Sequence, residues 1–182
     1  MKNPDYSLYN QETERLIFRA LRPSDFNAWL PLFEADNVAK FLEMDSTLSR
    51  SEMCQVWFDK SHHRLANNLG VMNVLQDKKS GALVGQCGLL LQTVNNEQRL
   101  EIGYSILPVY WGKGYASEAT QKCKVFAFKN RLANSLISVV HKQNVGSEKV
   151  AVRNGMTLER RMGDFNVFSV TSGYKTQEKV TS

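Results

Sequence analysis

Hydrophobic residues in the first third of the chain recur at helical spacing, and small polar residues suggest where helices begin. Helices are predicted over residues 26–33, 38–42 and 52–67. Serine and aspartate are common helix N-caps, so the first helix is expected to start at Ser24 or Asp25 and the third at Ser49 or Ser51. The apolar face predicted for the third helix contains Met53, Val56, Trp57 and Leu65.

The pattern changes to strand-like runs in the middle of the chain. Strands are predicted over residues 16–19, 71–75, 83–92 and 99–107. Segments 77–81 and 95–97 are rich in turn-forming residues, and they separate the last three of these strands. Short turns join antiparallel neighbours, so these three strands are expected to form a meander.

Helix and strand signals alternate in the last third. A helical stripe follows residue 114 and contains Ala116, Ala119, Cys123, Phe126 and Ala127. Residues 136–140 read as a buried strand, and Asn144 is expected to cap a helix that ends near Gly155. Strands at 157–162 and 167–170 would complete the sheet. The whole pattern predicts one α/β domain over residues 1–182, with a mixed, mostly antiparallel central sheet flanked by helices.

Composition narrows the class of protein. The 182 residues are 42% hydrophobic and 23% charged, which is typical of a globular domain. No apolar run reaches membrane-spanning length, and the three cysteines lie far apart, so a cytoplasmic protein without a membrane segment or a disulfide framework is expected. The net charge of +5 is spread among acidic residues, which argues against nucleic acid as a partner. No Cys/His cluster accompanies His62 and His63, so no metal site is predicted.

The segment from Tyr110 to Ala119 is the strongest chemical signal in the chain. It follows a predicted strand, contains Gly112 and Gly114, and leads into a predicted helix. Backbone N–H groups at such a helix start attract phosphate. A Walker loop would need Ser or Thr directly after Lys113, and a dinucleotide fingerprint would need glycine in place of Ser117. Neither known phosphate motif fits.

The segment instead resembles the acetyl-CoA turn of the GNAT acetyltransferases. Gly114 and Ala116 occupy the two small-residue positions of that motif, while Trp111 stands where most members have Arg or Gln. The complete run Tyr-Trp-Gly-Lys-Gly-Tyr-Ala-Ser-Glu-Ala is similar to the Rim-type branch, the N-terminal acetyltransferases of ribosomal proteins. Further similarity at both ends extends the resemblance over about residues 13–170.

The resemblance implies acetyl-CoA as acyl donor, bound beside a splayed strand or β-bulge. It implies that backbone groups of Ile106 and Leu107 hold the pantetheine arm and polarise the thioester. Pro108 ends the strand, so an N–H should be left free there. The remaining residues assigned to acetyl-CoA are Trp111, Gly112, Lys113, Gly114, Tyr115, Ala116, Ser117 and Asn144. Asn144 could serve both as helix cap and as a cofactor contact.

Glu101 is the candidate general base. Strand alternation places it on the face opposite Leu100, together with Gly103 and Ser105, two small residues expected to leave space beside it. The family often has an acid near the catalytic water at this position. The alternative is a sheet carboxylate that pairs with Arg99 or with a lysine.

Ser147 is the candidate general acid. Many relatives have a tyrosine one helical turn further on, where this chain has Ala151. Rim-type enzymes have serine in an Asn-x-x-Ser pattern near the sulfur, and Ser147 matches it. The alternative is a first-turn helix serine that bonds the backbone.

These features predict an N-acetyltransferase that works by direct attack on acetyl-CoA in a ternary complex. The acceptor suggested by the resemblance is a protein N-terminal α-amine. The same branch also acetylates small amines, and a non-catalytic acyl-CoA-binding module is a third possibility. Segments 41–49 and 164–174 are expected to contact the acceptor, in a monomer or a homodimer.

Overall fold

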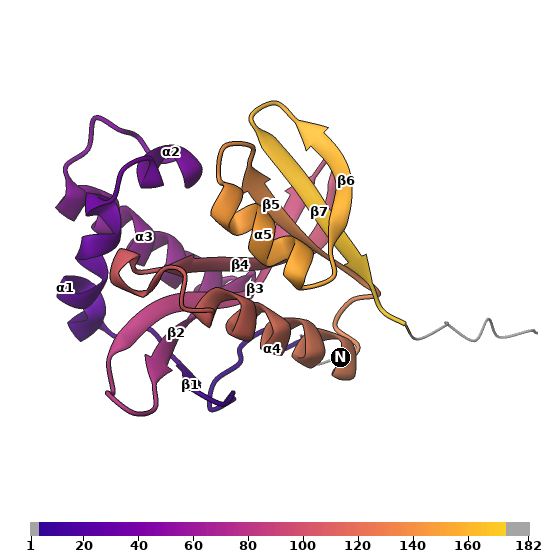
Figure 1. The fold of residues 1–182 in the computed structure, drawn as a ribbon, viewed down its shortest axis with the longest axis horizontal. Coiled ribbons are helices and arrows are strands. Elements are labelled where there is room, and N and C mark those ends of the chain that lie inside the picture. Colours follow the sequence, from indigo (N-terminus) through magenta and orange to yellow (C-terminus); the bar gives the residue numbers. More distant parts are fainter. Residues whose placement is uncertain (1–3, 174–182) are drawn as a thin grey trace, which may run out of the picture.

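The computed structural model describes residues 4–173, which form a seven-stranded sheet with helices on both faces (Figure 1). The spatial order is β1-β2-β3-β4-β5-β7-β6. The strands are β1 (Leu16–Arg19), β2 (Gly70–Asp77), β3 (Leu83–Val94), β4 (Glu97–Ile106), β5 (Ser135–His141), β6 (Thr157–Met162) and β7 (Phe165–Thr171). Every neighbouring pair is antiparallel except β4 and β5, which are parallel. The predicted mixed sheet and its meander are confirmed.

The helices agree with the sequence pattern except near residue 31. They are α1 (Phe26–Trp29), α2 (Val38–Phe41), α3 (Arg50–Ala66), α4 (Tyr115–Lys129) and α5 (Val145–Arg153), with short 3-10 turns η1 (Pro23–Asp25), η2 (Leu30–Glu34) and η3 (Pro108–Tyr110). The single helix predicted over 26–33 is wrong. Pro31 has no N–H and blocks the preceding turn, so the α-helix gives way to a 3-10 turn.

Asp25, one of the two predicted residues, stands at the N-cap position of α1, but its side chain does not bond the N–H groups of that helix. The Phe26 N–H bonds the Pro23 carbonyl, so α1 continues directly from the 3-10 turn η1. The buried Asp25 carboxylate instead accepts two 2.8 Å hydrogen bonds from the Arg19 guanidinium and one from the Arg22 N–H. The pair therefore joins β1 to the first helical segment.

Helix α3 begins where predicted, and its predicted face is confirmed at Met53 and Trp57 but wrong at its other two positions. Ser49 and Glu52 form a reciprocal capping box. Val56 and Leu65, predicted to be buried, are 44% and 54% exposed, and the buried side chains are Met53, Cys54 and Phe58. Apolar residues on this helix allow two overlapping stripes, and contact with η2 and β2 selects the second.

The two larger cores lie on opposite faces of the sheet, and a small third cluster contains Val94, Ile137 and Val167. Leu100, Ile102 and Ile106 of β4 pack with Ala119 and Cys123 of α4, as the alternation predicted. The other core joins α1, η2 and α3 to the sheet through Trp29, Phe33, Met53, Phe58 and Val74. Figure 1 shows α4 and α5 on one side of the sheet and α3 behind it.

Strands β4 and β5 separate soon after they meet. Their register is limited to Glu101 opposite Ile137. Beyond it, side chains occupy the main-chain groups that a longer ladder would use: the Glu101 carboxylate accepts from the Val139 N–H at 3.1 Å, and the Ser138 hydroxyl donates to the Ile102 carbonyl at 2.9 Å. The predicted opening is thus a splayed strand. It is not a β-bulge, because β4 keeps continuous register with β3.

No helix within residues 4–173 is long and apolar enough to cross a membrane.

Candidate active site

The opening between β4 and β5 exposes one edge of β4. Leu107 N–H donates to the Val84 carbonyl at 3.0 Å, so these residues form a hydrogen-bonded pair of the antiparallel ladder. Such pairs alternate, and the main-chain groups of Ile106 therefore point away from β3, toward the opening. The Ile106 N–H is the backbone donor placed to meet a ligand there. The expectation of a free N–H on Leu107 is corrected, because the β3 ladder extends one residue past the end of β4.

The turn that follows is built for an anion. Gly112 and Gly114 have φ angles of +73° and +83°, a region that glycine enters without strain. Gly114 is the N-cap of α4 and offers no side chain, and the first intrahelical bond runs from Glu118 N–H to Gly114 carbonyl. The N–H groups of the first helical turn are thus left for a ligand, with the positive end of the helix dipole behind them.

Trp111 connects this turn to the strand. Its indole N–H donates to the Ile106 carbonyl at 2.6 Å, while the side chain as a whole is 53% exposed. This contact occupies one of the two main-chain groups of Ile106 and leaves the N–H toward the opening. The tryptophan that departs from the generic GNAT motif therefore orders the strand end.

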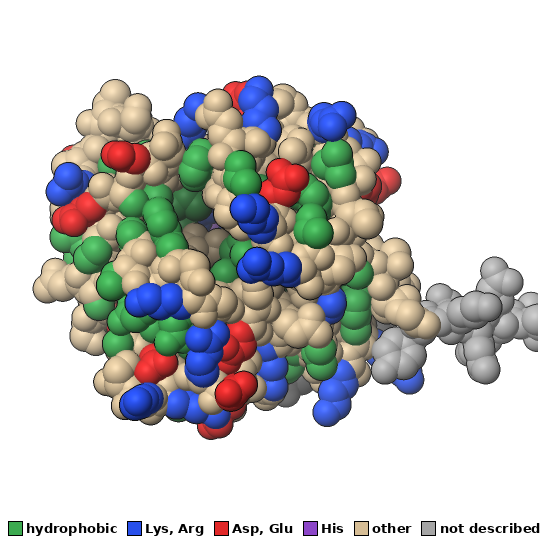
Figure 2. Space-filling view, viewed as in Figure 1, with side chains coloured by type: hydrophobic (Ala, Val, Ile, Leu, Met, Phe, Trp, Pro, Cys, Tyr) green, Lys and Arg blue, Asp and Glu red, His purple; other side chains and the backbone are tan. Residues whose placement is uncertain are grey.

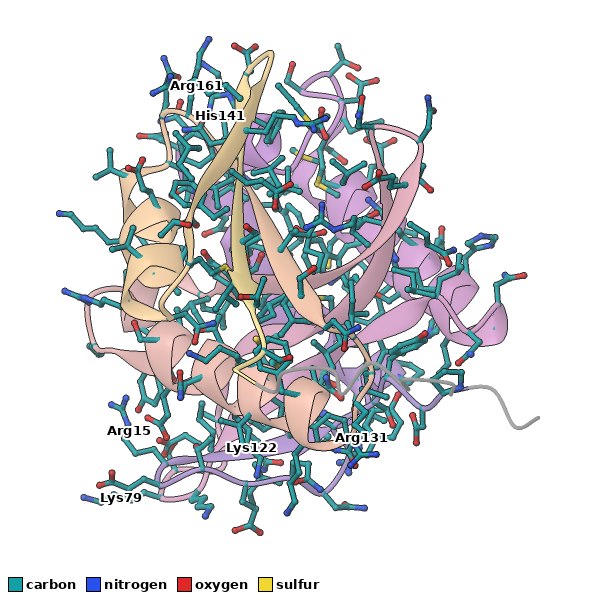
Figure 3. All side chains as sticks on the ribbon, turned by 90° about the vertical axis from the view of Figure 1, so that its right-hand side faces the viewer. Arg15, Lys79, Lys122, Arg131, His141 and Arg161 are labelled. Carbon is teal, nitrogen blue, oxygen red and sulfur yellow. The ribbon has the colours of Figure 1, made fainter. Side chains whose placement is uncertain are left out.

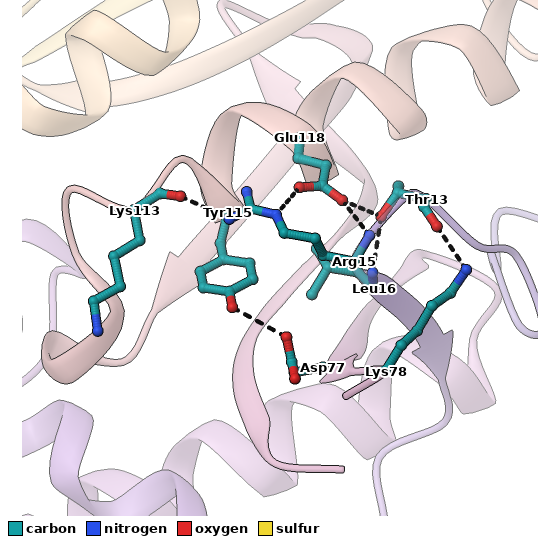
Figure 4. Close-up of polar contacts among 8 residues, drawn as sticks. All are labelled: Thr13, Arg15, Leu16, Asp77, Lys78, Lys113, Tyr115 and Glu118. Atoms are coloured by element: carbon teal, nitrogen blue, oxygen red, sulfur yellow. Dashed lines mark hydrogen bonds and ion pairs between the residues drawn. The ribbon is translucent and has the colours of Figure 1, made fainter. Parts of the chain in front are cut away.

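Three side chains of the N-terminal segment and β2 hold the start of α4 (Figure 4). Glu118 accepts hydrogen bonds from the Thr13 hydroxyl at 2.5 Å and from the Arg15 N–H and Nε at 2.9 and 2.6 Å. The Arg15 guanidinium lies 4.1 Å from the Tyr115 ring centroid and donates to the Lys113 carbonyl. The Tyr115 hydroxyl donates to Asp77 at 3.0 Å. Sequence analysis missed this role of Glu118.

Replacing Glu118 by Gln should destabilise the domain at neutral pH. Burial raises the pKa of Glu118, but hydrogen bonds from Thr13 and Arg15 and the Arg15 charge outweigh it and hold the pKa below its usual value. A lowered pKa in the folded state means stability that is present at neutral pH and lost as pH falls through that pKa. We expect a loss of about 1–3 kcal/mol at pH 7 by urea unfolding.

The difference between wild type and Glu118→Gln should shrink below about pH 4, where the wild-type carboxylate also protonates. The matched control is Glu14→Gln. Glu14 is an exposed glutamate between Thr13 and Arg15, and its replacement should leave stability nearly unchanged. Equal losses of stability in the two variants would contradict the conclusion that Glu118 stabilises the fold through its bonds to Thr13 and Arg15.

Glu101 is buried at the point where β4 and β5 separate. Its exposure is 8%, and its carboxylate accepts from the Gln92 amide at 2.8 Å as well as from Val139 N–H. Burial raises the pKa of Glu101; these hydrogen bonds and the charges of Arg64 and Lys60 oppose that rise without cancelling it. A buried carboxylate with a raised pKa in an opening of the sheet is suited to accept a proton.

Two expectations about the surroundings of Glu101 change. Arg99 does not pair with it, because the guanidinium makes two 3.1 Å contacts with Glu159. The space expected beside Gly103 is filled: a Cβ there would lie 2.9 Å from a Leu90 methyl and 3.2 Å from the Met72 sulfur. Neighbouring strands supply large side chains that the β4 pattern alone does not reveal.

Ser147 lies in the first turn of α5, where Asn144 caps the helix as predicted. The Asn144 side chain accepts from the Ser147 N–H at 3.1 Å, and the Tyr104 hydroxyl donates to the Ser147 carbonyl at 2.7 Å. Burial raises the pKa of Tyr104 well above its usual value, so the phenol stays neutral and serves as a donor. Tyr104 positions the serine, a role that sequence analysis missed; its signal was a polar group on the apolar face of β4.

The two candidate catalytic residues are associated with opposite faces of β4. Glu101 belongs to the β4 face that carries Arg99, whereas Tyr104, which holds Ser147, belongs to the face that packs on α4. A base on one face of β4 and a proton source near the other suit a reaction in which the acceptor amine and the leaving thiolate lie on different sides of the reacting carbon.

No group of three or more His, Cys, Asp or Glu side chains within residues 4–173 is placed to bind a metal ion. Basic side chains are dispersed. Arg15, Lys79 and Lys122 lie at one end of the molecule and Arg161 at the other (Figure 3), and acidic and basic groups are interspersed on the face that Figure 2 shows.

The chain is similar to several acetyltransferases. The acetyltransferase (GNAT) domain family matches residues 15–157. An uncharacterized protein of Bacillus subtilis, YkkB, is 32% identical over 51% of this chain and 54% of its own length, so that match spans about half of the relative. An uncharacterized N-acetyltransferase of Bacillus licheniformis, p20, is 29% identical over 76% of each chain.

Solved structures share the fold. An acetyltransferase from Agrobacterium tumefaciens has a TM-score of 0.75 at 24% identity, covering 94% of this chain and 99% of that one. RimL, a ribosomal L7/L12 alpha-N-protein acetyltransferase in complex with coenzyme A, has a TM-score of 0.72 at 18% identity over 89% and 97%. The family match covers more than half of the chain and includes β4, the glycine turn and α4, so this protein belongs to the GNAT acetyltransferase family and is an acyltransferase.

Proposed function

We propose that the protein transfers the acetyl group of acetyl-CoA to a primary amine, the N-terminal α-amine of a protein, by direct attack within a ternary complex. The observation that carries this proposal is the alignment of three features along one segment: the splay at Glu101, the inward-facing N–H of Ile106, and the open start of α4. In acetyl-CoA the thioester, the pantetheine arm and the pyrophosphate follow one another in the same order as these three features.

Acetyl-CoA fits the groups present. The Ile106 N–H is suited to pair with the pantetheine arm, and the backbone from Gly112 to Ser117 is suited to the pyrophosphate. Lys113 is exposed and can add positive charge. Leu107, Trp111 and Asn144 remain assigned as residues that border the arm. Coenzyme A is bound by RimL, and acetyl-CoA and AMP by MccE, the microcin C7 self-immunity acetyltransferase, whose structure has a TM-score of 0.68 to this chain.

Glu101 and Ser147 would carry two of the proton transfers that acetyl transfer requires. Glu101 takes a proton from the acceptor ammonium, directly or through water, and leaves the nitrogen with a lone pair. The nitrogen attacks the thioester carbon and loses one of its two remaining protons to water, and the C–S bond breaks as the tetrahedral intermediate collapses. Ser147 relays a proton from water to the departing thiolate. No acyl-enzyme is required, and the three cysteines are buried.

The acceptor would bind where two segments meet above the end of β5. The Phe41 ring lies 5.1 Å from the His141 ring, which lies 5.2 Å from Phe165. This contact joins segments 41–49 and 164–173, and Tyr174, the end of the second predicted segment, lies outside the described residues. Figure 2 shows a recess between the half of the molecule that carries α2 and the half that carries α5, with hydrophobic side chains beside it.

A panel of acceptors tests this proposal. Mass spectrometry would follow acetylation of peptides with free N-termini and of small amines (amino acids, amino sugars, polyamines and aminoglycosides), with acetyl-CoA supplied. We expect acetylation at the α-amine of peptides. Modification of a small amine alone would replace the peptide acceptor with a metabolite. Acetyl-CoA binding without any transfer across the panel would favour a non-catalytic acyl-CoA-binding module.

A further inference from the structure

A continuous chain of hydrogen bonds connects helix α3 to Glu101. The Arg64 guanidinium donates through Nη2 to the Gln92 side-chain oxygen at 3.1 Å. The same amide donates through its nitrogen to Glu101 Oε2 at 2.8 Å, and Glu101 Oε1 accepts from the Val139 N–H. Arg64 can only donate, so it fixes which end of the Gln92 amide faces each partner.

Arg64 is itself held in place. Its Nη1 donates to the Leu69 carbonyl at 3.1 Å and to the Leu91 carbonyl at 3.2 Å, which attaches the end of α3 to β3. Its side chain also lines a cavity of about 240 Å³ together with Asp5. Because its Nη1 makes these two main-chain hydrogen bonds, the guanidinium has a fixed position. It therefore loses little conformational freedom when it orients Gln92.

We propose that Arg64 is a positioning residue for the catalytic base: through the Gln92 amide it fixes the direction of the Glu101 carboxylate and favours its ionised form. This inference rests on the proposed role of Glu101. Without Arg64, the Gln92 amide could rotate and turn its oxygen toward Glu101, which would place two acceptors face to face. The carboxylate would then bind its proton more tightly and act as a base only at higher pH.

Other charged or titratable groups near Glu101 contribute less. They are Lys60 of α3, Arg99 of β4 with its partner Glu159 of β6, and Tyr104 on the opposite face of β4. Lys60 is exposed and makes no hydrogen bond to any residue from 4 to 173, so salt screens its charge. The alternative to the proposal is that Arg64 serves only to attach α3 to β3.

Carbon-13 NMR of protein labelled at glutamate side chains separates these two roles without any acceptor. The Glu101 signal is identified by its loss in Glu101→Gln, and its titration is followed in Gln92→Leu, Arg64→Met and Lys60→Met. We expect the Glu101 midpoint to rise by about one pH unit, a tenfold tighter binding of the proton, in the first two variants. Lys60→Met, the matched loss of a cation from the same helix, should move it much less.

A further variant at position 92 predicts a larger shift, which a general folding defect would not produce. Gln92→Glu keeps an acceptor for Arg64 but replaces the donor toward Glu101 with a like charge, so the midpoint should rise further than in Gln92→Leu. An unchanged Glu101 midpoint in Arg64→Met and Gln92→Leu would overturn the proposal and leave Glu101 as base untouched. If the midpoint moves but Glu101→Gln acetylates as fast as wild type, the base assignment falls, and the positioning role falls with it.

Discussion

Replacing Glu101 by Gln is expected to lower kcat for acetyl transfer by about a hundredfold to ten-thousandfold near pH 7, with little change in the KM for acetyl-CoA. The variant removes the group that takes the proton from the acceptor ammonium, while the main-chain groups at Ile106 and at the start of α4 remain in place. Steady-state kinetics with the acceptor identified in the panel would measure both constants.

The pH dependence gives this prediction a second check. An α-amine has an ordinary pKa of about 7.7–8.0, so above pH 8.5 most of the acceptor is already deprotonated in solution. The deficit of Glu101→Gln should therefore narrow as pH rises. Burial raises the pKa of Glu101 despite its hydrogen bonds. As pH is lowered, the wild-type rate should therefore begin to fall at a higher pH than it would with an exposed glutamate as base.

A matched variant separates lost chemistry from lost structure. Glu97→Gln changes an exposed glutamate at the start of the same strand and should leave kcat unchanged. Thermal unfolding of both variants is needed, because the Glu101 carboxylate also bonds Val139 and Gln92. A folded Glu101→Gln with wild-type kcat and an unchanged pH profile would show that another group, or water alone, removes the proton.

Local patterns predicted most of the fold because each depends on neighbours in sequence. The capping box of Ser49 and Glu52, the cap at Asn144 and the left-handed Gly155 are all formed within a few residues. The prediction of one helix across Pro31 was wrong because it ignored a local rule, that proline interrupts an α-helix. The buried face of α3 could not be read locally, since the partner surfaces, not the helix sequence, select between its two apolar stripes.

The site was harder to predict because its supports come from distant parts of the chain. The bonds from Thr13 and Arg15 to Glu118 cross more than a hundred residues of sequence, and no pattern around Glu118 announces them. The filled space at Gly103 depends on Leu90 and Met72 of the adjoining strands. The motif showed where the opening would be, whereas the structure shows what fills and orders it.

The glycine turn offers the sharpest test of the acetyl-CoA site. Gly112→Asp should weaken acetyl-CoA binding about a hundredfold, because bringing like charges together costs several kcal/mol and each 1.4 kcal/mol is a factor of ten. A side chain at Gly112 meets no atom within 4 Å, so it would project into open space beside the turn. Isothermal titration calorimetry with acetyl-CoA would measure the change.

Gly112→Asn is the matched control, since asparagine and aspartate share a shape and both tolerate the left-handed backbone that φ = +73° requires. The two variants differ by one negative charge, so the ratio of their dissociation constants isolates the repulsion of the phosphates from any strain in the turn. That ratio should fall as salt is added, because the charge at this exposed position is screened. Equal affinities of the Asp and Asn variants at low salt would mean that the pyrophosphate binds elsewhere, and the free N–H groups at the start of α4 would then need another ligand.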